Sequence, residues 1–165
     1  MMPRYIRQRD NYSCGPVALM NAIKWTGVTK TTSYAMLPSW RLICRTRKVE
    51  GTSFSDLFRA VKIARLFAPL FVKKAKPKVK LGDIDAHLKH GGAVILGSVS
   101  EPMGGFHWFL ITEKLNQAGE ASYKVVNFDR RATQRFVSVK TIKRSMRLAR
   151  SLKGYPRALF IKGAA

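Results

Sequence analysis

A mostly apolar segment from Cys14 to Trp25 constrains the fold of this chain more than any other stretch. Its hydrophobic residues fall on nearly every side of a helix with 3.6 residues per turn, so the predicted helix must be buried almost all round. Pro16 is tolerated in a first helical turn, and Gly27 is a typical stop signal just past the end. Such a helix needs neighbours on all sides, which indicates a central position in a domain.

The chain is large enough to provide those neighbours. It has 165 residues, 46% of them apolar, which predicts a single domain over residues 1–165. The longest apolar run, residues 64–72, is about half of a membrane span of roughly 18 residues, so no span is expected. The polar N-terminus lacks the apolar centre of a signal peptide, and two cysteines suit a reducing compartment. We therefore expect a cytoplasmic protein.

Helical signals come first in the chain and strand signals follow. Ser53 and Asp56 resemble a capping box for a helix over about 53–66, and Asp83 is expected to be the N-cap of a short helix that stops at Gly91-Gly92. The remaining expected elements are a short helix near 33–37, strands at 70–73, 93–99, 106–113, 122–128, 134–139 and 158–162, and a helix at 140–151. Residues 73–80 read as a basic loop. The pattern predicts an α+β fold with N-terminal helices packed on a largely antiparallel sheet.

Cys14 stands at the start of the first helix, where a thiol has particular chemistry. The partial positive charge of a helix N-terminus favours thiolate over thiol, and Gly15 leaves room for a substrate backbone. Gln8, six residues earlier, can direct an amide donor at a developing oxyanion. The alternatives are that Cys14 is a small buried hydrophobe, as we interpret Cys44, and that Gln8 is an ordinary polar residue of a basic arm.

Two later residues can complete a nucleophilic site. His107 lies in GGFHWFLIT, residues 104–112, where a polar ring on an apolar strand needs a partner. It can act as the base that takes the Cys14 proton, and the alternative is a core histidine with a satisfied ring. Asn127 ends the apolar run YKVVN and is a candidate to orient the imidazole; Asp129, two residues on and on the same strand face, is the alternative.

The order of Gln8, Cys14-Gly15-Pro16, His107 and Asn127 resembles the papain-like cysteine peptidases. Within them it is most similar to the bacteriocin-processing, double-glycine leader peptidases and their stand-alone relatives, over about residues 5–150. Members of that family usually have Asp-Pro where this chain has Asn127-Phe128. The resemblance implies a papain-like fold and a thiol protease that hydrolyses peptide or isopeptide bonds after small or glycine residues, with Gln8, Cys14, His107 and Asn127 as site residues. It favours Asn127 over Asp129, because Asn127 ends the apolar run as the family's acid does.

Neither a metal nor another cofactor is expected. The two cysteines are 30 residues apart, and no close spacing of Cys, His and acidic residues resembles a metal site. The chain also lacks the glycine-rich signature of a phosphate-binding loop.

The net charge is the second unusual feature of the sequence. Thirty-one Lys and Arg residues against nine acids give +22, a field that attracts polyanions. The cations cluster in three segments, residues 41–48, 73–80 and 140–157, which we expect to contact nucleic acid or an acidic protein assembly. The alternative function is therefore a catalytically weak or inactive papain-like domain that serves as a basic binding or structural protein, within a virion or another nucleoprotein assembly.

Overall fold

A six-stranded antiparallel sheet forms the centre of the computed structural model, which describes residues 3–100, 105–152 and 155–163. The strand order is β1-β6-β2-β3-β4-β5, and all pairings between these strands are antiparallel. The strands are β1 (Leu70–Lys76), β2 (Ala93–Ser100), β3 (Gly105–Gln117), β4 (Glu120–Val126), β5 (Gln134–Ser138) and β6 (Arg157–Gly163). The expected combination of helices with an antiparallel sheet is confirmed.

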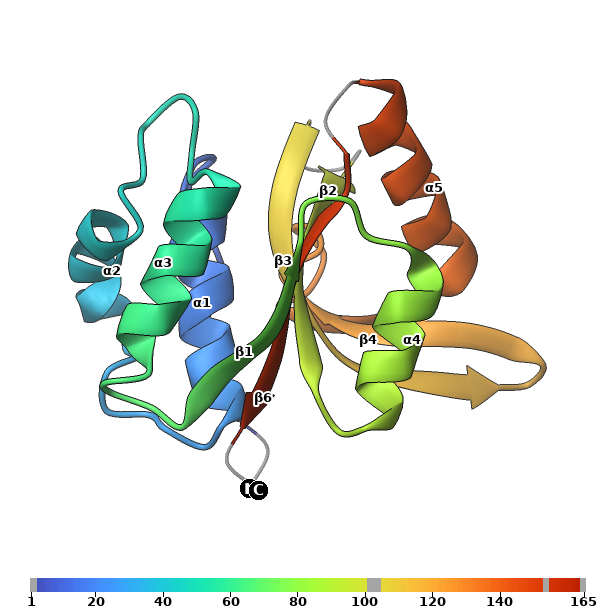
Figure 1. The fold of residues 1–165 in the computed structure, drawn as a ribbon, viewed down its shortest axis with the longest axis horizontal. Helices are drawn as coiled ribbons and strands as arrows, with labels where there is room; N and C mark the ends of the chain where they lie inside the picture. Colours follow the sequence, from blue (N-terminus) through green and yellow to red (C-terminus); the bar gives the residue numbers. More distant parts are fainter. Residues whose placement is uncertain (1–2, 101–104, 153–154, 164–165) are drawn as a thin grey trace.

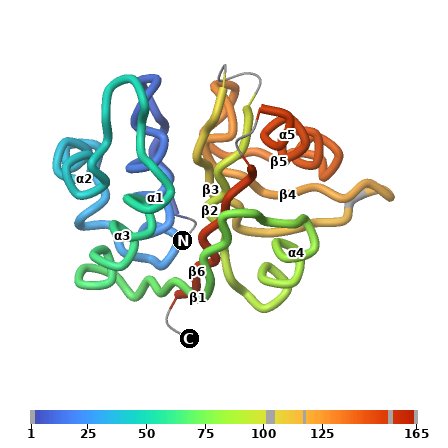
Figure 2. Tube along the Cα trace, turned by 45° about the horizontal axis from the view of Figure 1, so that its top comes forward, coloured from blue at the N-terminus to red at the C-terminus, as the bar shows by residue number. Residues whose placement is uncertain are grey.

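Helices cover both sides of this sheet (Figures 1 and 2). One side carries α1 (Cys14–Trp25), the short 3-10 helix η1 (Tyr34–Met36), α2 (Leu37–Ile43) and α3 (Phe54–Ala64). The other side carries α4 (Leu81–Lys89) and α5 (Val139–Ser151). Each side has its own hydrophobic core, because strand side chains alternate between the two faces: Trp108 and Leu110 of β3 belong to the first core, and Phe109 and Ile111 to the second.

The central position predicted for the first helix is confirmed. Every residue of α1 from Cys14 to Ile23 is buried, and the helix packs against β3, α2 and α3. The helix begins at Cys14 and ends at Trp25, and Gly27 follows with a φ of 91°, a conformation that glycine adopts without strain. The thiol of Cys14 is therefore carried on an element with little freedom to move.

Helix caps were predicted correctly in one place and wrongly in another. Ser53 is the N-cap of α3 and accepts the main-chain N–H of Asp56 at 3.1 Å. Asp83 is not an N-cap, because α4 begins at Leu81 and the cap residue is Lys80. Asp83 is the third residue of that helix, and its carboxylate accepts the Lys80 N–H at 3.1 Å, a capping role exercised from inside the first turn.

The basic segment 73–80 is not wholly a loop, and its interpretation as one was wrong for its first half. Lys73, Lys74 and Lys76 lie in β1, which continues three residues past the predicted end of the strand and pairs with β6. β1 is an edge strand. Lysines are common on such edges because their charge opposes pairing with another chain. The sequence also predicts a turn from Glu101-Pro102 to Gly105, and that segment falls almost entirely outside the described residues.

Candidate active site

The start of α1 is organised by Asp10, a residue that the sequence reading did not select. Its Oδ1 accepts the main-chain N–H groups of Tyr12 at 2.9 Å and Ser13 at 2.7 Å, and its Oδ2 accepts the Ser13 hydroxyl at 2.7 Å. Arg41 of α2 forms an ion pair with the same carboxylate. Burial alone would raise the pKa of Asp10, but these hydrogen bonds outweigh it and lower the pKa. The signal in the sequence was an Asp four residues before the first residue of a predicted helix, in a position to form an Asx turn.

The Cys14 thiol is nearly buried, with 8% of the residue exposed. Burial raises its pKa, and this effect outweighs the main-chain N–H groups of Trp108, Gly15 and Cys14 itself, which lower the pKa. The resting group is therefore a neutral thiol that faces donors able to stabilise a negative charge. Trp108 immediately follows His107 in β3, so its N–H places the sulfur beside the segment that carries the predicted base.

The space beside Gly15 is occupied by protein. A Cβ atom at Gly15 would lie 2.5 Å from Oγ1 of Thr52, so the side chain of Thr52 fills the room that the sequence reading assigned to a substrate backbone. The Trp108 indole N–H donates to the Thr52 carbonyl at 2.9 Å, and the Trp108 ring stacks on Phe54. The segment before α3 thus forms a fixed wall next to Cys14.

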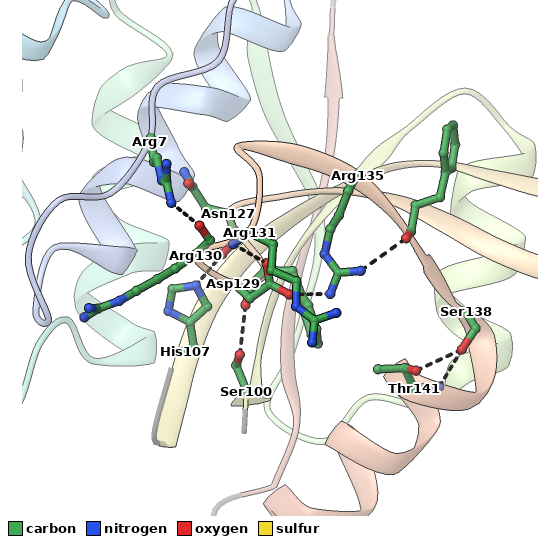
Figure 3. A network of polar contacts seen from close by, with 12 residues as sticks. Arg7, Ser100, His107, Asn127, Asp129, Arg130, Arg131, Arg135, Ser138 and Thr141 are labelled. Carbon is green, nitrogen blue, oxygen red and sulfur yellow. Dashed lines mark hydrogen bonds and ion pairs between the residues drawn. The ribbon is translucent and has the colours of Figure 1, made fainter. Parts of the chain in front are cut away.

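His107 is buried, with 3% exposure, and its ring is fixed by Asn127 (Figure 3). Nε2 is hydrogen-bonded to the main-chain carbonyl of Asn127. A carbonyl can only accept, so Nε2 carries the proton and Nδ1 of the neutral ring is the basic nitrogen. Burial lowers the pKa of His107 to about 4, against the opposing effects of the Asn127 carbonyl and the Asp129 charge. The imidazole is therefore neutral at neutral pH.

The side chain of Asn127 holds the N-terminal arm rather than the imidazole. Its Nδ2 donates to the Ile6 carbonyl at 2.7 Å, and its Oδ1 accepts the Gln8 N–H at 3.3 Å. Asn21 of α1 contacts the same arm, accepting the Ile6 N–H at 2.8 Å and donating to the Ile6 carbonyl at 3.0 Å. The φ of Asn127 is 57°, a left-handed conformation that asparagine tolerates. Asn21 was missed by sequence reasoning, although a lone asparagine in an apolar helix is a signal for a buried polar partner.

Gln8 is brought to this region by the arm, but its amide does not contact the thiol in this conformation. Its Nε2 donates to the Asp10 carbonyl at 2.7 Å, and its Oε1 is buried without a hydrogen-bond partner among the described residues. A buried acceptor without a partner is uncommon and is expected at sites that change on binding a ligand.

Asp129 makes no hydrogen bond to the His107 ring within the described part of the chain. Its fully buried carboxylate forms an ion pair with Arg135 and accepts the Arg131 N–H at 2.9 Å. Burial alone would raise the pKa of Asp129, but the hydrogen bonds and charges of Arg135 and Arg131 lower it. Asp129 acts on His107 through its charge, which raises the pKa of the imidazole.

Three of the four predicted site residues are joined by hydrogen bonds. The Gln8 N–H donates to Asn127 Oδ1, and the His107 ring donates to the Asn127 carbonyl. The Cys14 thiol makes no hydrogen bond to the His107 ring among the described residues. His107 pairs with Ser98, whose hydroxyl accepts from Ser145 of α5, and its ring stacks on Phe109, so the imidazole lies on the α5 face of the sheet, opposite α1. Cys44 also lies apart from this group, and burial raises its pKa to about 12. The chain thus holds the groups that acyl transfer needs, a thiol, a neutral imidazole and main-chain donors, but this conformation does not bring the imidazole to the thiol.

No known protein-family model matches this chain, and a search of curated proteins finds no match to it either. Within residues 3–100, 105–152 and 155–163, no group of three or more His, Cys, Asp or Glu side chains is arranged to hold a metal ion. In the same residues, every helix falls short of the length and apolarity needed to cross a bilayer.

Proposed function

We propose that this protein is a papain-like cysteine peptidase, a hydrolase in which Cys14 attacks an amide carbonyl and His107 moves the proton. The observation that carries this proposal is the position of the Cys14 sulfur. It lies at the start of a buried helix, where the main-chain N–H of Trp108 opposes the effect of burial and lowers the thiol pKa; Trp108 follows His107, whose Nε2 is already occupied. The remaining nitrogen, Nδ1, is the basic atom of that ring.

The reaction begins from a neutral thiol and a neutral imidazole. Nδ1 of His107 takes the Cys14 proton as the sulfur–carbon bond forms, and the carbonyl electrons move onto oxygen. When the oxyanion collapses, the carbon–nitrogen bond breaks and the imidazolium gives its proton to the leaving amine. Water, deprotonated by His107, then attacks the thioester and regenerates the thiol. Burial disfavours both charged forms in the resting state. The His107 ring also lies with Phe109 on the α5 face of the sheet, so the proposal requires substrate binding to rearrange the start of β3 before the proton can be transferred.

Gln8 supplies a donor to the oxyanion in this proposal. Its amide has to leave the Asp10 carbonyl and turn toward the substrate, and the buried, unpartnered Oε1 is consistent with a side chain that is not in its final position. Loss of an oxyanion donor typically lowers the rate by about 10²-fold or more. We therefore expect Gln8→Ala to lower kcat by that factor. Gln8→Glu keeps the size of the side chain but replaces the amide donor with a carboxylate, which repels the oxyanion, so it should lower kcat at least as much.

The proposed substrates have small residues or glycine before the cleaved bond. Thr52 and Trp108 form a wall against Gly15, beside the nucleophile, and this wall narrows the approach to the sulfur. The family resemblance points the same way, toward double-glycine sites. A peptide or isopeptide bond after Gly-Gly is the first substrate to test.

The experiment is alkylation of the two cysteines, followed by mass spectrometry across pH, together with hydrolysis of a fluorogenic Gly-Gly peptide. We expect Cys14 to be labelled much faster than Cys44 near neutral pH, and His107→Ala to slow only Cys14. Cys14→Ala should abolish hydrolysis, and Cys44→Ala, the matched control for a buried cysteine, should retain it. Equal labelling of both cysteines, unaffected by His107→Ala, would refute the peptidase proposal.

A second candidate is a papain-like domain that binds polyanions with little or no catalysis, in the cytoplasm or inside a virion or nucleoprotein assembly. Two observations favour it. Burial raises the pKa of the Cys14 thiol and lowers the pKa of the His107 imidazole, so both side chains are neutral at rest. The chain also has a net charge of +22. Cys14→Ala discriminates the two functions. It abolishes hydrolysis if the protein is a peptidase, and it leaves polyanion binding unchanged if the protein is a binding domain.

A further inference from the structure

A cavity lies on the far side of the sheet from α1, between α5, β5 and the segment that follows β4. Its volume is about 400 Å³. Cavities of roughly 300–1,000 Å³ are typical of small-molecule and cofactor sites. The peptidase proposal makes no use of this cavity, and Cys14 does not line it.

Three guanidinium groups from three different segments line this cavity. Arg131 comes from the loop after β4, Arg135 from β5 and Arg144 from α5, and none of the described lining residues is acidic. Arg135 is paired with Asp129 on one edge, but its buried Nε has no hydrogen-bond partner in the described residues. The side chain of Arg131 makes no hydrogen bond or ion pair within the same part of the chain, and Figure 3 shows it beside Arg135. Arg131 and the Nε of Arg135 therefore offer donors to an anion in the cavity.

The first turn of α5 adds to this positive potential. Ser138 is the N-cap of the helix and accepts the Thr141 N–H at 3.1 Å, and both residues line the cavity. The N-terminal end of a helix carries partial positive charge that favours an anion. Guanidinium forks, a helix start and hydroxyl groups are together the donors that recognise phosphate oxygens.

Apolar residues also line the cavity. These are Val99, Phe128, Val137 and Leu148, and the guanidinium of Arg135 lies 5.5 Å from the centre of the Phe128 ring. A bare phosphate ion is much smaller than about 400 Å³ and would fill only part of the cavity. A nucleotide fills more of it, because its phosphate meets the arginines while its sugar and base contact the apolar residues.

We propose that this cavity binds the phosphate of a nucleotide unit within a nucleic-acid strand. The chain has a charge of +22, which favours a polyanion over a single small ligand. Exposed Lys140 and Arg147 lie one turn to either side of Arg144 on α5, where three- and four-residue spacings make neighbours. They extend the positive surface beyond the cavity along the path of the next phosphates.

Fluorescence anisotropy of a labelled single-stranded oligothymidylate, titrated with the full chain over a range of salt, tests this proposal. The variant is Arg131→Gln with Arg144→Gln. The matched control is Lys30→Gln with Lys62→Gln, which removes the same charge from exposed positions on the α1 and α3 side, outside the three basic clusters. We expect the cavity variant to bind at least about tenfold more weakly, with a salt slope shallower by roughly one to two, and the control to change little. Circular dichroism confirms folding, and either single arginine variant replaces the pair if the double variant unfolds.

Competition identifies the source of the phosphate. Displacement by an unlabelled oligonucleotide, with thymidine monophosphate competing only at far higher concentration, supports a nucleic-acid strand. Equal competition by the monophosphate supports the same phosphate chemistry with a free nucleotide as ligand. Equal loss of affinity in the cavity and control variants would overturn the proposal, because binding would then follow net charge alone.

Discussion

His107 donates its Nε2–H to the main-chain carbonyl of Asn127, while the Asn127 side chain holds the Ile6 carbonyl 121 residues away in the chain. One residue thus fixes the tautomer of the imidazole and the path of the arm that carries Gln8. The two tasks use different atoms, so substitution can separate them.

Substitution of Asn127 should affect the arm more than the imidazole. Asn127→Asp keeps an acceptor for the Gln8 N–H but loses the Nδ2 donor to Ile6, and we expect a loss of roughly 1–3 kcal/mol in the free energy of unfolding. Asn127→Gly removes both side-chain bonds but permits the φ of 57°. In both variants the His107 ring should keep its Nε2–H tautomer, which nitrogen NMR of the imidazole measures. A switch to Nδ1–H in the glycine variant would show that the side chain, not the main chain, orients the ring.

The buried imidazole makes the stability of the protein dependent on pH. The pKa of His107 is lowered to about 4 in the folded protein, against about 6.5 in an unfolded chain. As the pH falls, the imidazole of the unfolded chain is protonated before that of the folded protein. The contribution of His107 to the free energy of unfolding is therefore fully present above pH 6.5 and is lost as the pH falls from 6.5 to 4. We expect a loss of up to about 3 kcal/mol from this residue.

Denaturant unfolding from pH 7 to pH 4 measures this effect. His107→Gln is the control, because a Gln amide can donate to the Asn127 carbonyl without titrating. Its stability should fall less steeply over the same range. The carboxyls of Asp10 and Asp129, whose pKa values are lowered, contribute a loss only below the ordinary carboxyl range near pH 4. Identical slopes for wild type and His107→Gln would contradict a buried neutral imidazole.

Gly15 should not tolerate a side chain. In Gly15→Ala, the new Cβ would meet Oγ1 of Thr52 at 2.5 Å and its Cβ at 2.6 Å, and overpacking of this kind costs about 1–3 kcal/mol. Gly82→Ala is the matched control, since that glycine lies in α4 with no atom within 4 Å of the new methyl group; it should be neutral or slightly stabilising. Thermal unfolding compares the two. Partial recovery on adding Thr52→Gly would locate the strain, and no recovery would place it elsewhere.

Asp10 should matter for the nucleophile although it does not contact the sulfur. Asp10→Asn removes the charge that Arg41 pairs with and leaves one amide end facing donors, so we expect a loss of roughly 1–2 kcal/mol in the free energy of unfolding. The disordered turn should slow alkylation of Cys14, against the smaller opposing effect of removing a charge that raises the thiol pKa. Glu120→Gln, an equal change of charge at an exposed position of β4, controls for net charge. Unchanged labelling of Cys14 in the Asp10 variant would show that the turn does not position the thiol.

Local patterns in the sequence were sufficient for the elements that depend on local rules. The bounds of α1, its burial on nearly all sides, the placement of Cys14 at its start and the Ser53 cap follow from periodicity, helix termini and capping, which act over a few residues. The same reasoning predicted helices on an antiparallel sheet. It failed at Asp83, because an acidic residue caps a helix equally well from the cap or from the first turn, and at residues 73–76, because an edge strand can carry a row of lysines.

Only the tertiary structure decided how the candidate site is connected. Asn127 meets His107 through its carbonyl and the arm through its side chain, Thr52 fills the space at Gly15, and Asp10 pairs with Arg41 from another helix. Each of these contacts joins segments that are distant in the chain, and a residue type does not specify whether its main chain or its side chain will be used. The sequence by itself determined which groups were available for chemistry. Packing decided their partners, and burial set their protonation states.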